Sequence, residues 1–166
     1  MALTLNRRRF IGASAAAFGG AIMLRPSLGR AAAFPVTHSD AEWHRILNPR
    51  QFAVLRRAAT EPPFSSPLLK EHRRGLFGCA GCRHDLFAST TKFESGTGWP
   101  SFWKPLAKAI RTRTDRSLGF ERTEVLCATC GGHLGHVFDD GPKPTGLRYC
   151  MNGLSLAFHP AQAPAS

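Results

Sequence analysis

Four of the five cysteines form two closely spaced pairs. They are Cys79 and Cys82 in the stretch CAGC, and Cys127 and Cys130 in the stretch CATC, with 44 residues between the pairs. A gap of two residues lets both thiolates of a tight turn face one ion, and two such turns supply the ligands of a tetrahedral zinc site. The spacing therefore predicts one structural Zn²⁺ per chain. Two disulfides, or a redox-active CxxC pair, are the alternatives for these residues.

The fifth cysteine, Cys150, has polar neighbours in an otherwise apolar stretch. Arg148 lies two residues before it and Asn152 two residues after it, so on a strand all three side chains would share one face. A guanidinium beside a thiol favours the thiolate, which is the nucleophilic form. A single cysteine with no such neighbours is ordinarily a small buried hydrophobe, and the flanking residues favour a reactive thiol instead.

Two histidines and a tryptophan could complete such a site. His133 and His136 occur in GGHLGHVFDDGP, with Asp139 and Asp140 behind them. Histidine exchanges protons near neutral pH and can serve a reactive thiol. Trp99 stands in SGTGWPSFW, and an aromatic side chain exposed in such a loop can form the wall of a pocket. Structural histidines and a core tryptophan are the alternatives.

Two short helices are expected before these motifs, in HSDAEWHRILNPRQFAVLRRAATEPPF. Asn48 is a suitable N-cap, Pro49 fits the first helical position, and Gln51 completes a capping box. Pro62 and Pro63 are expected to end the second helix.

Short apolar or alternating runs, separated by turn residues, follow from Gly75 onward. They are GLFGC, HDLF, FERTEVLC, HLGHVF, LRYCM and LSLAF. This pattern is typical of antiparallel strands. The sequence therefore predicts a mainly β domain with a short helical cover at its N-terminal end.

The first 33 residues are expected to be a removable export signal. NRRRFIG resembles the twin-arginine motif, a short apolar stretch follows, and Ala31–Ala33 fits a small-residue cleavage site. The apolar stretch spans 15 residues and is too short to cross a bilayer core of about 30 Å, although an uncleaved anchor is the alternative. The mature protein is therefore expected to be periplasmic or otherwise exported, with no stable membrane span.

Removal of this segment also lowers the charge. The formal charge of the chain is +11, and residues 1–33 hold five arginines and no acidic residue, which leaves +6. The remaining basic residues form no long run. A zinc-ribbon module that binds nucleic acid would explain the four paired cysteines and the charge, but not Cys150, Trp99 or the histidines. We therefore expect no nucleic-acid partner.

Together these motifs resemble one enzyme family. FESGTGWPSFW and RTEVLCATCGGHLGHVFDDGPKPTGLRYCMN, with the two CxxC turns, are similar to the B-type peptide methionine (R)-S-oxide reductases. The similarity covers residues 40–158, preceded by a linker over 34–39 and followed by a tail over 159–166. The family implies a β-rich fold of two antiparallel sheets with a structural zinc.

The resemblance also implies the roles of the site residues. Cys150 would be the nucleophile, and Trp99 would receive the S-methyl group of the substrate. Three residues would surround the sulfoxide oxygen and its water: His133, His136 and Asn152. Arg148 would lie beside the thiolate, and Asp140 would orient a histidine.

The implied reaction reduces the R epimer of methionine sulfoxide in oxidised proteins and peptides. It would pass through a cysteine sulfenic acid. Many relatives carry a second cysteine where this chain has Thr97, so a thioredoxin-like protein or a small thiol is expected to regenerate Cys150. A thiol–disulfide oxidoreductase that uses a CxxC pair is a further alternative.

Overall fold

A computed structural model of the protein describes residues 33–162. The expected twin-arginine segment lies outside the described residues, apart from Ala33 at its end. The described part begins with helix α1 (Asp40–Ile46), which is capped by Ser39 and Glu42. No helix among residues 33–162 is long and apolar enough to cross a membrane.

Helix α2 (Pro49–Arg57) begins as the sequence predicts. Asn48 and Gln51 form a reciprocal capping box around the first turn, with Pro49 at the first helical position. Its C-terminal end differs from the expectation, because the chain leaves the helix at Ala58, which adopts a left-handed conformation with φ of 52°. Pro62 and Pro63 therefore follow an already finished helix.

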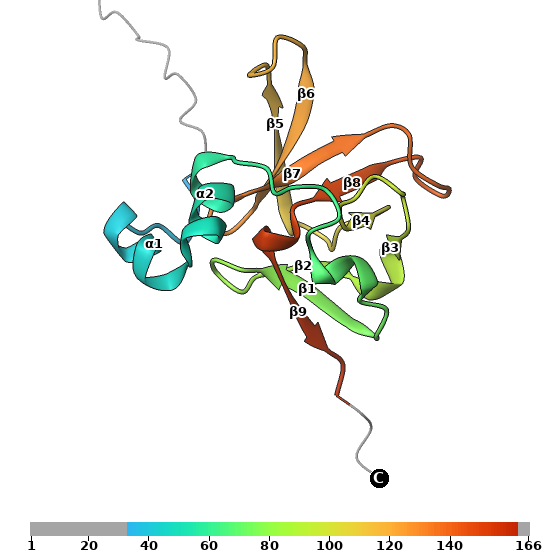
Figure 1. Ribbon diagram of the computed structural model, residues 1–166, viewed down its shortest axis with the longest axis horizontal. Coiled ribbons are helices and arrows are strands. Elements are labelled where there is room, and N and C mark those ends of the chain that lie inside the picture. The colour runs from blue at the N-terminus through green and yellow to red at the C-terminus, as the bar shows by residue number, and fades with distance from the viewer. Residues whose placement is uncertain (1–32, 163–166) are drawn as a thin grey trace, which may run out of the picture. The chain divides into compact units, whose positions relative to one another are not determined.

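The strands form two antiparallel sheets, as the sequence predicts (Figure 1). A three-stranded sheet has the order β2-β1-β9, and a six-stranded sheet has the order β3-β4-β8-β7-β6-β5. The strands are β1 (Gly75–Cys79), β2 (Asp85–Ala88), β3 (Lys92–Phe93), β4 (Ser101–Phe102), β5 (Ile110–Asp115), β6 (Arg122–Cys127), β7 (His133–Phe138), β8 (Arg148–Met151) and β9 (Leu156–Pro160). Three short 3-10 turns accompany them: η1 (Pro67–Lys70), η2 (Ser89–Thr91) and η3 (Gly153–Ser155).

A cluster of phenylalanines joins the two sheets. Phe77 and Phe87 of the small sheet and Phe102 of the large sheet are all fully buried. The ring of Phe102 stacks on Phe87 at 4.4 Å between centroids and meets the edge of Phe77 at 5.0 Å. Full burial of a phenylalanine side chain stabilises a fold by about 1.5–3 kcal/mol. This cluster therefore fixes β4 against the small sheet, next to β8.

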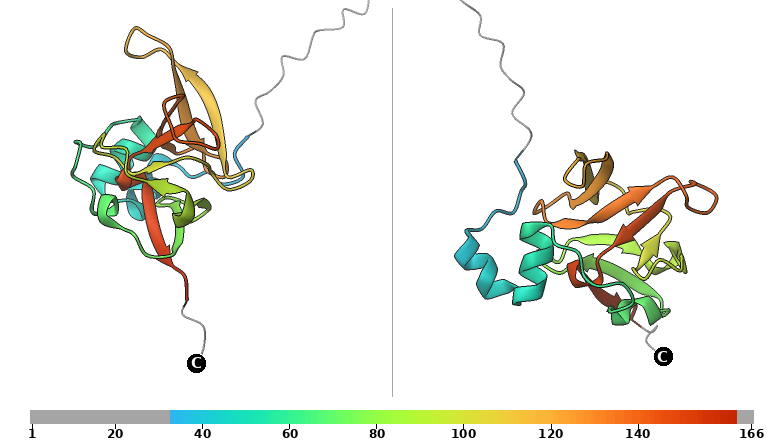
Figure 2. Two further views of the ribbon diagram at one scale, coloured as in Figure 1. Left: turned by 90° about the vertical axis from the view of Figure 1, so that its right-hand side faces the viewer. Right: turned by 45° about the horizontal axis from the view of Figure 1, so that its top comes forward.

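Strand β5 has no counterpart among the runs that the sequence predicts. Its residues IRTRTD alternate between threonine and charged or apolar side chains, and most of them are exposed or half-buried. It pairs with β6 along its whole length at the edge of the large sheet, and the hairpin projects from the rest of the described domain (Figure 2). Edge strands need fewer apolar residues because one side faces water.

The segments expected to be a linker and a tail both make ordered contacts. In the linker, the Val36 N–H donates to the Thr129 carbonyl at 2.9 Å, and the Arg111 guanidinium lies over the ring of Phe34. At the other end, β9 runs on through His159 and Pro160 in register with β1.

Candidate active site

Strand β8 carries Cys150 into the middle of the large sheet. Cys150 lies directly opposite Ser101 of β4 on one side and His136 of β7 on the other. Directly opposed residues of antiparallel strands present their side chains on the same face. The register of β7 and β8 therefore makes the thiol and the imidazole neighbours. This register depends on how side chains alternate between the two faces of the sheet along each strand.

Cys150 and His136 line one cavity of about 220 Å³. Trp99 and Asn152 line it as well, so the structure brings together four of the residues that the sequence selects. The remaining lining residues are Thr60, Arg122, Gly135 and Phe138. The cavity thus combines a thiol, an imidazole, an amide and apolar aromatic walls, which suits a small ligand with one polar and one apolar end.

Gly135 allows the close approach of β7 and β8 at this cavity. A Cβ atom at this position would lie 2.1 Å from the Cys150 carbonyl oxygen and 3.0 Å from the Met151 Cα. Any side chain would therefore push β8 away and separate Cys150 from His136.

Arg148 lies beside Cys150 but is held by Asp140. Its Nε and one terminal nitrogen donate to the two Asp140 oxygens, each at 2.8 Å, and its guanidinium lies 4.4 Å from the ring centroid of Phe138. The hydrogen bond to Asp140 raises the pKa of Arg148, and the nearby Cys150 acts in the same direction. The expectation that Asp140 orients a histidine is therefore wrong in this structure, because both carboxylate oxygens bind the guanidinium.

His133 is oriented by Glu124, which the sequence reasoning missed. The His133 Nδ1 lies 2.7 Å from the Glu124 carboxylate, and both side chains are 4% exposed. Burial lowers the pKa of His133, with Glu124 acting in the opposite direction. Although burial alone would raise the pKa of Glu124, hydrogen bonds from Arg113 and His133 lower it overall. A neutral His133 therefore donates from Nδ1 to an ionised Glu124, and its Nε2 is left as an acceptor.

That Nε2 atom is buried and has no hydrogen-bond partner among the described residues. Buried polar atoms are normally paired with protein or ordered water. His133 stands behind His136, with 5.4 Å between the ring centroids, and is not part of the cavity wall. The two predicted histidines are thus neighbours in the structure, but only His136 faces the cavity directly.

His136 is held by a second carboxylate that the sequence reasoning missed. Its Nε2 lies 2.8 Å from the Asp115 carboxylate, which also accepts from Arg122 at 2.6 Å. Hydrogen bonds from the Ser117 backbone and hydroxyl, and then from His136, lower the pKa of Asp115. An ionised Asp115 therefore fixes the orientation of the imidazole that faces Cys150.

Glu61 connects two walls of the cavity. Its backbone carbonyl accepts from the Trp99 indole N–H at 3.1 Å, and its backbone N–H donates to the Asn152 side-chain oxygen at 3.0 Å. Its buried carboxylate accepts from the N–H groups of Gly153 and Leu154 at the start of η3. Glu61 thereby sets the distance between the aromatic wall and the amide wall, and this role was also missed from the sequence.

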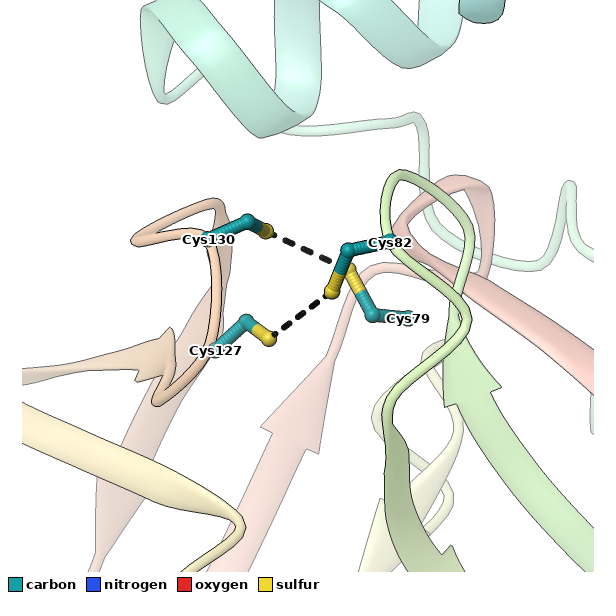
Figure 3. A group of neighbouring side chains, drawn as sticks. All are labelled: Cys79, Cys82, Cys127 and Cys130. Atoms are coloured by element: carbon teal, nitrogen blue, oxygen red, sulfur yellow. Dashed lines mark hydrogen bonds between the residues drawn. The ribbon is translucent and has the colours of Figure 1, made fainter. Parts of the chain in front are cut away.

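The four paired cysteines meet at a separate place, between the β1–β2 turn and the β6–β7 turn (Figure 3). Their sulfur atoms all lie within 4.8 Å of one another. The Cys79 and Cys130 sulfurs are 3.7 Å apart, and the Cys82 and Cys127 sulfurs are 3.5 Å apart. A tetrahedron with Zn–S bonds of ~2.3 Å has edges of about 3.8 Å. The cluster therefore fits a four-coordinate metal ion.

The two turns share one backbone geometry. The N–H of Arg83 donates to the Cys79 carbonyl at 2.8 Å, and the N–H of Gly131 donates to the Cys127 carbonyl at 2.9 Å. In each turn the N–H of the first cysteine also donates to the carbonyl of the residue five positions later. Cys79 donates to His84, and Cys127 donates to Gly132. Such matched turns present both thiols of a pair to one point, as the CxxC spacing predicts.

Comparison with known proteins agrees with this architecture. The family model of the SelR domain matches residues 47–160. A peptide methionine sulfoxide reductase MsrB from Thiobacillus denitrificans is 53% identical over 123 residues, which cover 74% of this chain and 93% of that protein. The MsrB of Leptospira interrogans is 51% identical over 126 residues, with coverage of 75% and 96%. That of Bradyrhizobium diazoefficiens is 54% identical over 126 residues, with coverage of 75% and 91%.

These relatives do not favour the alternative of a nucleic-acid-binding zinc ribbon. Their similarity extends over three quarters of the chain, and the SelR match spans both the cysteine cluster and the Cys150 cavity. The chain therefore belongs to the SelR family of B-type methionine sulfoxide reductases.

Proposed function

We propose that the protein reduces the R epimer of methionine sulfoxide in peptides and proteins to methionine, and so repairs oxidative damage. The observation that carries this proposal is the placement of Cys150 opposite His136 in one cavity that Trp99 also lines. A sulfoxide has a polar oxygen and an apolar methyl group on one sulfur, and the cavity offers a partner for each. Because sulfoxide sulfur is chiral, such a shaped site accepts one epimer.

The chemistry begins at Cys150. Its thiolate attacks the sulfoxide sulfur, and His136, directly or through water, supplies a proton to the oxygen. The oxygen is then transferred to Cys150, which becomes a sulfenic acid, and the reduced methionine leaves. Asp115 and Glu124 keep the two imidazoles in one orientation during these steps.

An external thiol completes the cycle. Its sulfur attacks the Cys150 sulfenic acid and displaces water, which gives a mixed disulfide, and a second thiol then releases Cys150 and carries the disulfide away. We propose a thioredoxin-like protein or a small thiol as this reductant, because Thr97 occupies the position of the second cysteine in many relatives. No redox cofactor is required, since the electrons come from thiols.

We propose that the four-cysteine cluster binds one structural Zn²⁺. Its four sulfurs are all supplied by protein, so the site would be closed, unlike a catalytic zinc site that keeps one position open. Cys79, Cys82, Cys127 and Cys130 would hold the ion and thereby join the β1–β2 turn of the small sheet to the β6–β7 turn of the large sheet. The zinc would contribute no step of the reaction.

We also propose that the protein acts outside the cytoplasm. The twin arginines Arg7 and Arg8, the short apolar stretch and Ala31–Ala33 support export by the twin-arginine route. This route carries folded proteins, so the zinc could be bound before export. Replacing Arg7 and Arg8 by lysine should retain the full-length protein in the cytoplasm, as measured by cell fractionation. Unchanged export of this variant would contradict the proposed route.

The purified protein, incubated with dithiothreitol and a peptide that contains methionine sulfoxide, tests the proposed reaction. We expect reduction of the R epimer alone, as followed by chromatography of the two epimers. Cys150→Ser should abolish turnover and retain the fold, since this side chain is part of a cavity wall and not of the buried core. Equal activity on both epimers, or substantial activity of Cys150→Ser, would reject the proposal.

A further inference from the structure

Thr97 contacts the reactive sulfur directly. The Thr97 hydroxyl oxygen lies 3.7 Å from the Cys150 sulfur, which is within reach of a hydrogen bond that involves sulfur. The threonine is half-buried in the loop between β3 and β4, two residues before Trp99. In the sequence, Thr97 was notable only because it stands where a second cysteine could have been.

The Thr97 hydroxyl is one end of a chain of three hydroxyls. It lies 2.8 Å from the Ser95 hydroxyl, which lies 2.7 Å from the Ser101 hydroxyl, and Ser101 donates to the Trp99 carbonyl at 3.1 Å. Ser101 is 1% exposed and stands directly opposite Cys150 in the sheet. The hydroxyl chain therefore runs from the Cys150 sulfur on β8, through the β3–β4 loop, to Ser101 on the paired strand β4.

Each hydroxyl has one hydrogen to donate, so this chain has two arrangements in which all three hydroxyls donate. With a neutral thiol, Cys150 donates to Thr97, Thr97 to Ser95, Ser95 to Ser101, and Ser101 to the Trp99 carbonyl. With a thiolate, the direction reverses: Ser101 donates to Ser95, Ser95 to Thr97, and Thr97 to the sulfur. The reversal needs only rotation of three hydroxyl groups, and it exchanges the Ser101 bond to the Trp99 carbonyl for a Thr97 bond to the charged sulfur.

We propose that Thr97 is a catalytic residue that donates a hydrogen bond to the Cys150 thiolate, and that Ser95 positions its hydroxyl for this purpose. The proposal rests on the proposed function of Cys150 as nucleophile. Hydrogen bonds to charged groups are stronger than those between neutral groups, so the reversed arrangement stabilises the thiolate relative to the thiol. In this chain a hydroxyl thus assists the nucleophile at the position where a relative would carry a thiol.

Alkylation of Cys150 by iodoacetamide, followed by mass spectrometry of its peptide from pH 5 to pH 10, tests the proposal without using the reductase activity. Thr97→Val keeps the volume and removes the donor. We expect alkylation about tenfold slower at neutral pH, with the same limiting rate at high pH, which corresponds to the ~1.4 kcal/mol of one hydrogen bond to a charged group. Thr97→Ser should restore the original profile, because it retains the hydroxyl.

Ser95→Ala tests whether the Thr97 hydroxyl needs Ser95 to position it as a donor. It should shift the profile in the same direction as Thr97→Val but by a smaller amount. Thr112→Val, at an exposed position on β5, is the control for the loss of a threonine hydroxyl and should leave the profile unchanged. A profile of Thr97→Val or of Ser95→Ala that superimposes on that of the unsubstituted protein would overturn the inference, and the reductase assignment would stand.

Discussion

Glu124 holds His133 by a hydrogen bond of 2.7 Å between two side chains that are each 4% exposed. The His133 ring lies next to that of His136, and the buried His133 Nε2 has no protein partner among the described residues. Such an imidazole has a fixed tautomer and a free acceptor. It can therefore accept a hydrogen bond from a buried water molecule.

Glu124→Gln should lower kcat by about tenfold to hundredfold, with a smaller change in KM. The amide can present its N–H to His133 and so favours the wrong tautomer, as loss of an orienting carboxylate does elsewhere. Steady-state kinetics on a peptide substrate measure both constants. Glu121→Gln, which removes an exposed carboxylate of the same hairpin that pairs with Arg116, is the matched control. Equal kcat in the two variants would exclude a role for Glu124 in catalysis.

Asp115 should make stability depend on pH in the acidic range. Its pKa is lowered in the folded state by the Ser117 N–H and hydroxyl and by His136, so its stabilisation is fully present above the unfolded pKa of about 3.9 and is lost as the pH falls toward the folded value. Asp115→Asn should therefore melt at a lower temperature than the unsubstituted protein between pH 5 and pH 7, and the difference should shrink below about pH 4.

The difference between the two proteins is the quantity to measure, because acid also protonates cysteine thiolates in both of them. Thermal unfolding followed by circular dichroism gives the two melting temperatures at each pH. Asp85→Asn, at an exposed position on β2, should show no such pH-dependent difference. A gap between the Asp115→Asn and unsubstituted proteins that stays constant down to pH 3 would show that Asp115 is not stabilised as an anion.

Asp115 also explains which part of the site was hidden in the sequence. Cys150, Trp99, His136 and Asn152 stand in motifs of unusual residue types and line one cavity, where strand register sets Cys150 opposite His136. Asp115 instead lies at the end of β5, whose polar alternation gives no core-facing pattern. Strand β5 and the Asp115 carboxylate were therefore missed for the same reason. The pairing of β5 with β6 brings the Asp115 carboxylate within reach of His136 on β7.

Asp140 and Glu124 illustrate a second limit of prediction from the sequence, which concerns side-chain partners. The family resemblance implied that Asp140 orients a histidine, yet Asp140 binds Arg148. Glu124 lies directly opposite His136 across the β6–β7 pair, but its carboxylate reaches His133. Spacing along the chain does not determine which partner a long side chain selects. A glutamate next to the apolar run VLC of β6 was nevertheless a signal, because a carboxylate in a buried strand needs partners.

Arg148→Ala should slow the alkylation of Cys150 at neutral pH by about tenfold. The Arg148 guanidinium lies beside Cys150, and a positive charge next to a thiol is expected to promote its reaction as a nucleophile. Arg148→Lys keeps a positive charge and loses the two-pronged bond to Asp140, so it should have an intermediate rate. Iodoacetamide alkylation across pH values measures all three proteins. Identical profiles for Arg148→Ala and the unsubstituted protein would remove Arg148 from the activation of the nucleophile.

Cys79→Ser and Cys127→Ser should each lose zinc and cooperative folding. Structural zinc in small peptides contributes roughly 10–16 kcal/mol at neutral pH, which is similar to the whole stability of a typical domain. Metal analysis should give one zinc per unsubstituted chain, and thermal unfolding should show no folded baseline for either variant. Cys150→Ser is the matched control and should keep its zinc. A zinc-free preparation with full activity and an unchanged melting temperature would contradict the assignment.

The oxidised protein should retain Cys150 as a sulfenic acid. If four of the five cysteines bind zinc, no second thiol is free to attack it, and the Thr97 hydroxyl beside it cannot form a disulfide. One equivalent of substrate without reductant should therefore leave Cys150 reactive toward dimedone, with no intramolecular disulfide in the mass spectrum. An internal disulfide in the unsubstituted protein would mean that a proposed zinc ligand is the resolving thiol, and the four-cysteine site would be wrong.

Thr97→Cys should convert this behaviour into internal disulfide formation. The Thr97 hydroxyl oxygen is 3.7 Å from the Cys150 sulfur, so a cysteine sulfur at that place must move about 1.7 Å to reach the ~2.05 Å of a disulfide. Gly96 precedes the position, is exposed with open space around it, and allows the loop to adjust on that side. After one equivalent of substrate, the variant should lose dimedone reactivity and gain a cross-link between the introduced thiol and Cys150, as found by peptide mapping. Persistent dimedone labelling of Cys150 in this variant would show that the loop holds the two sulfurs apart.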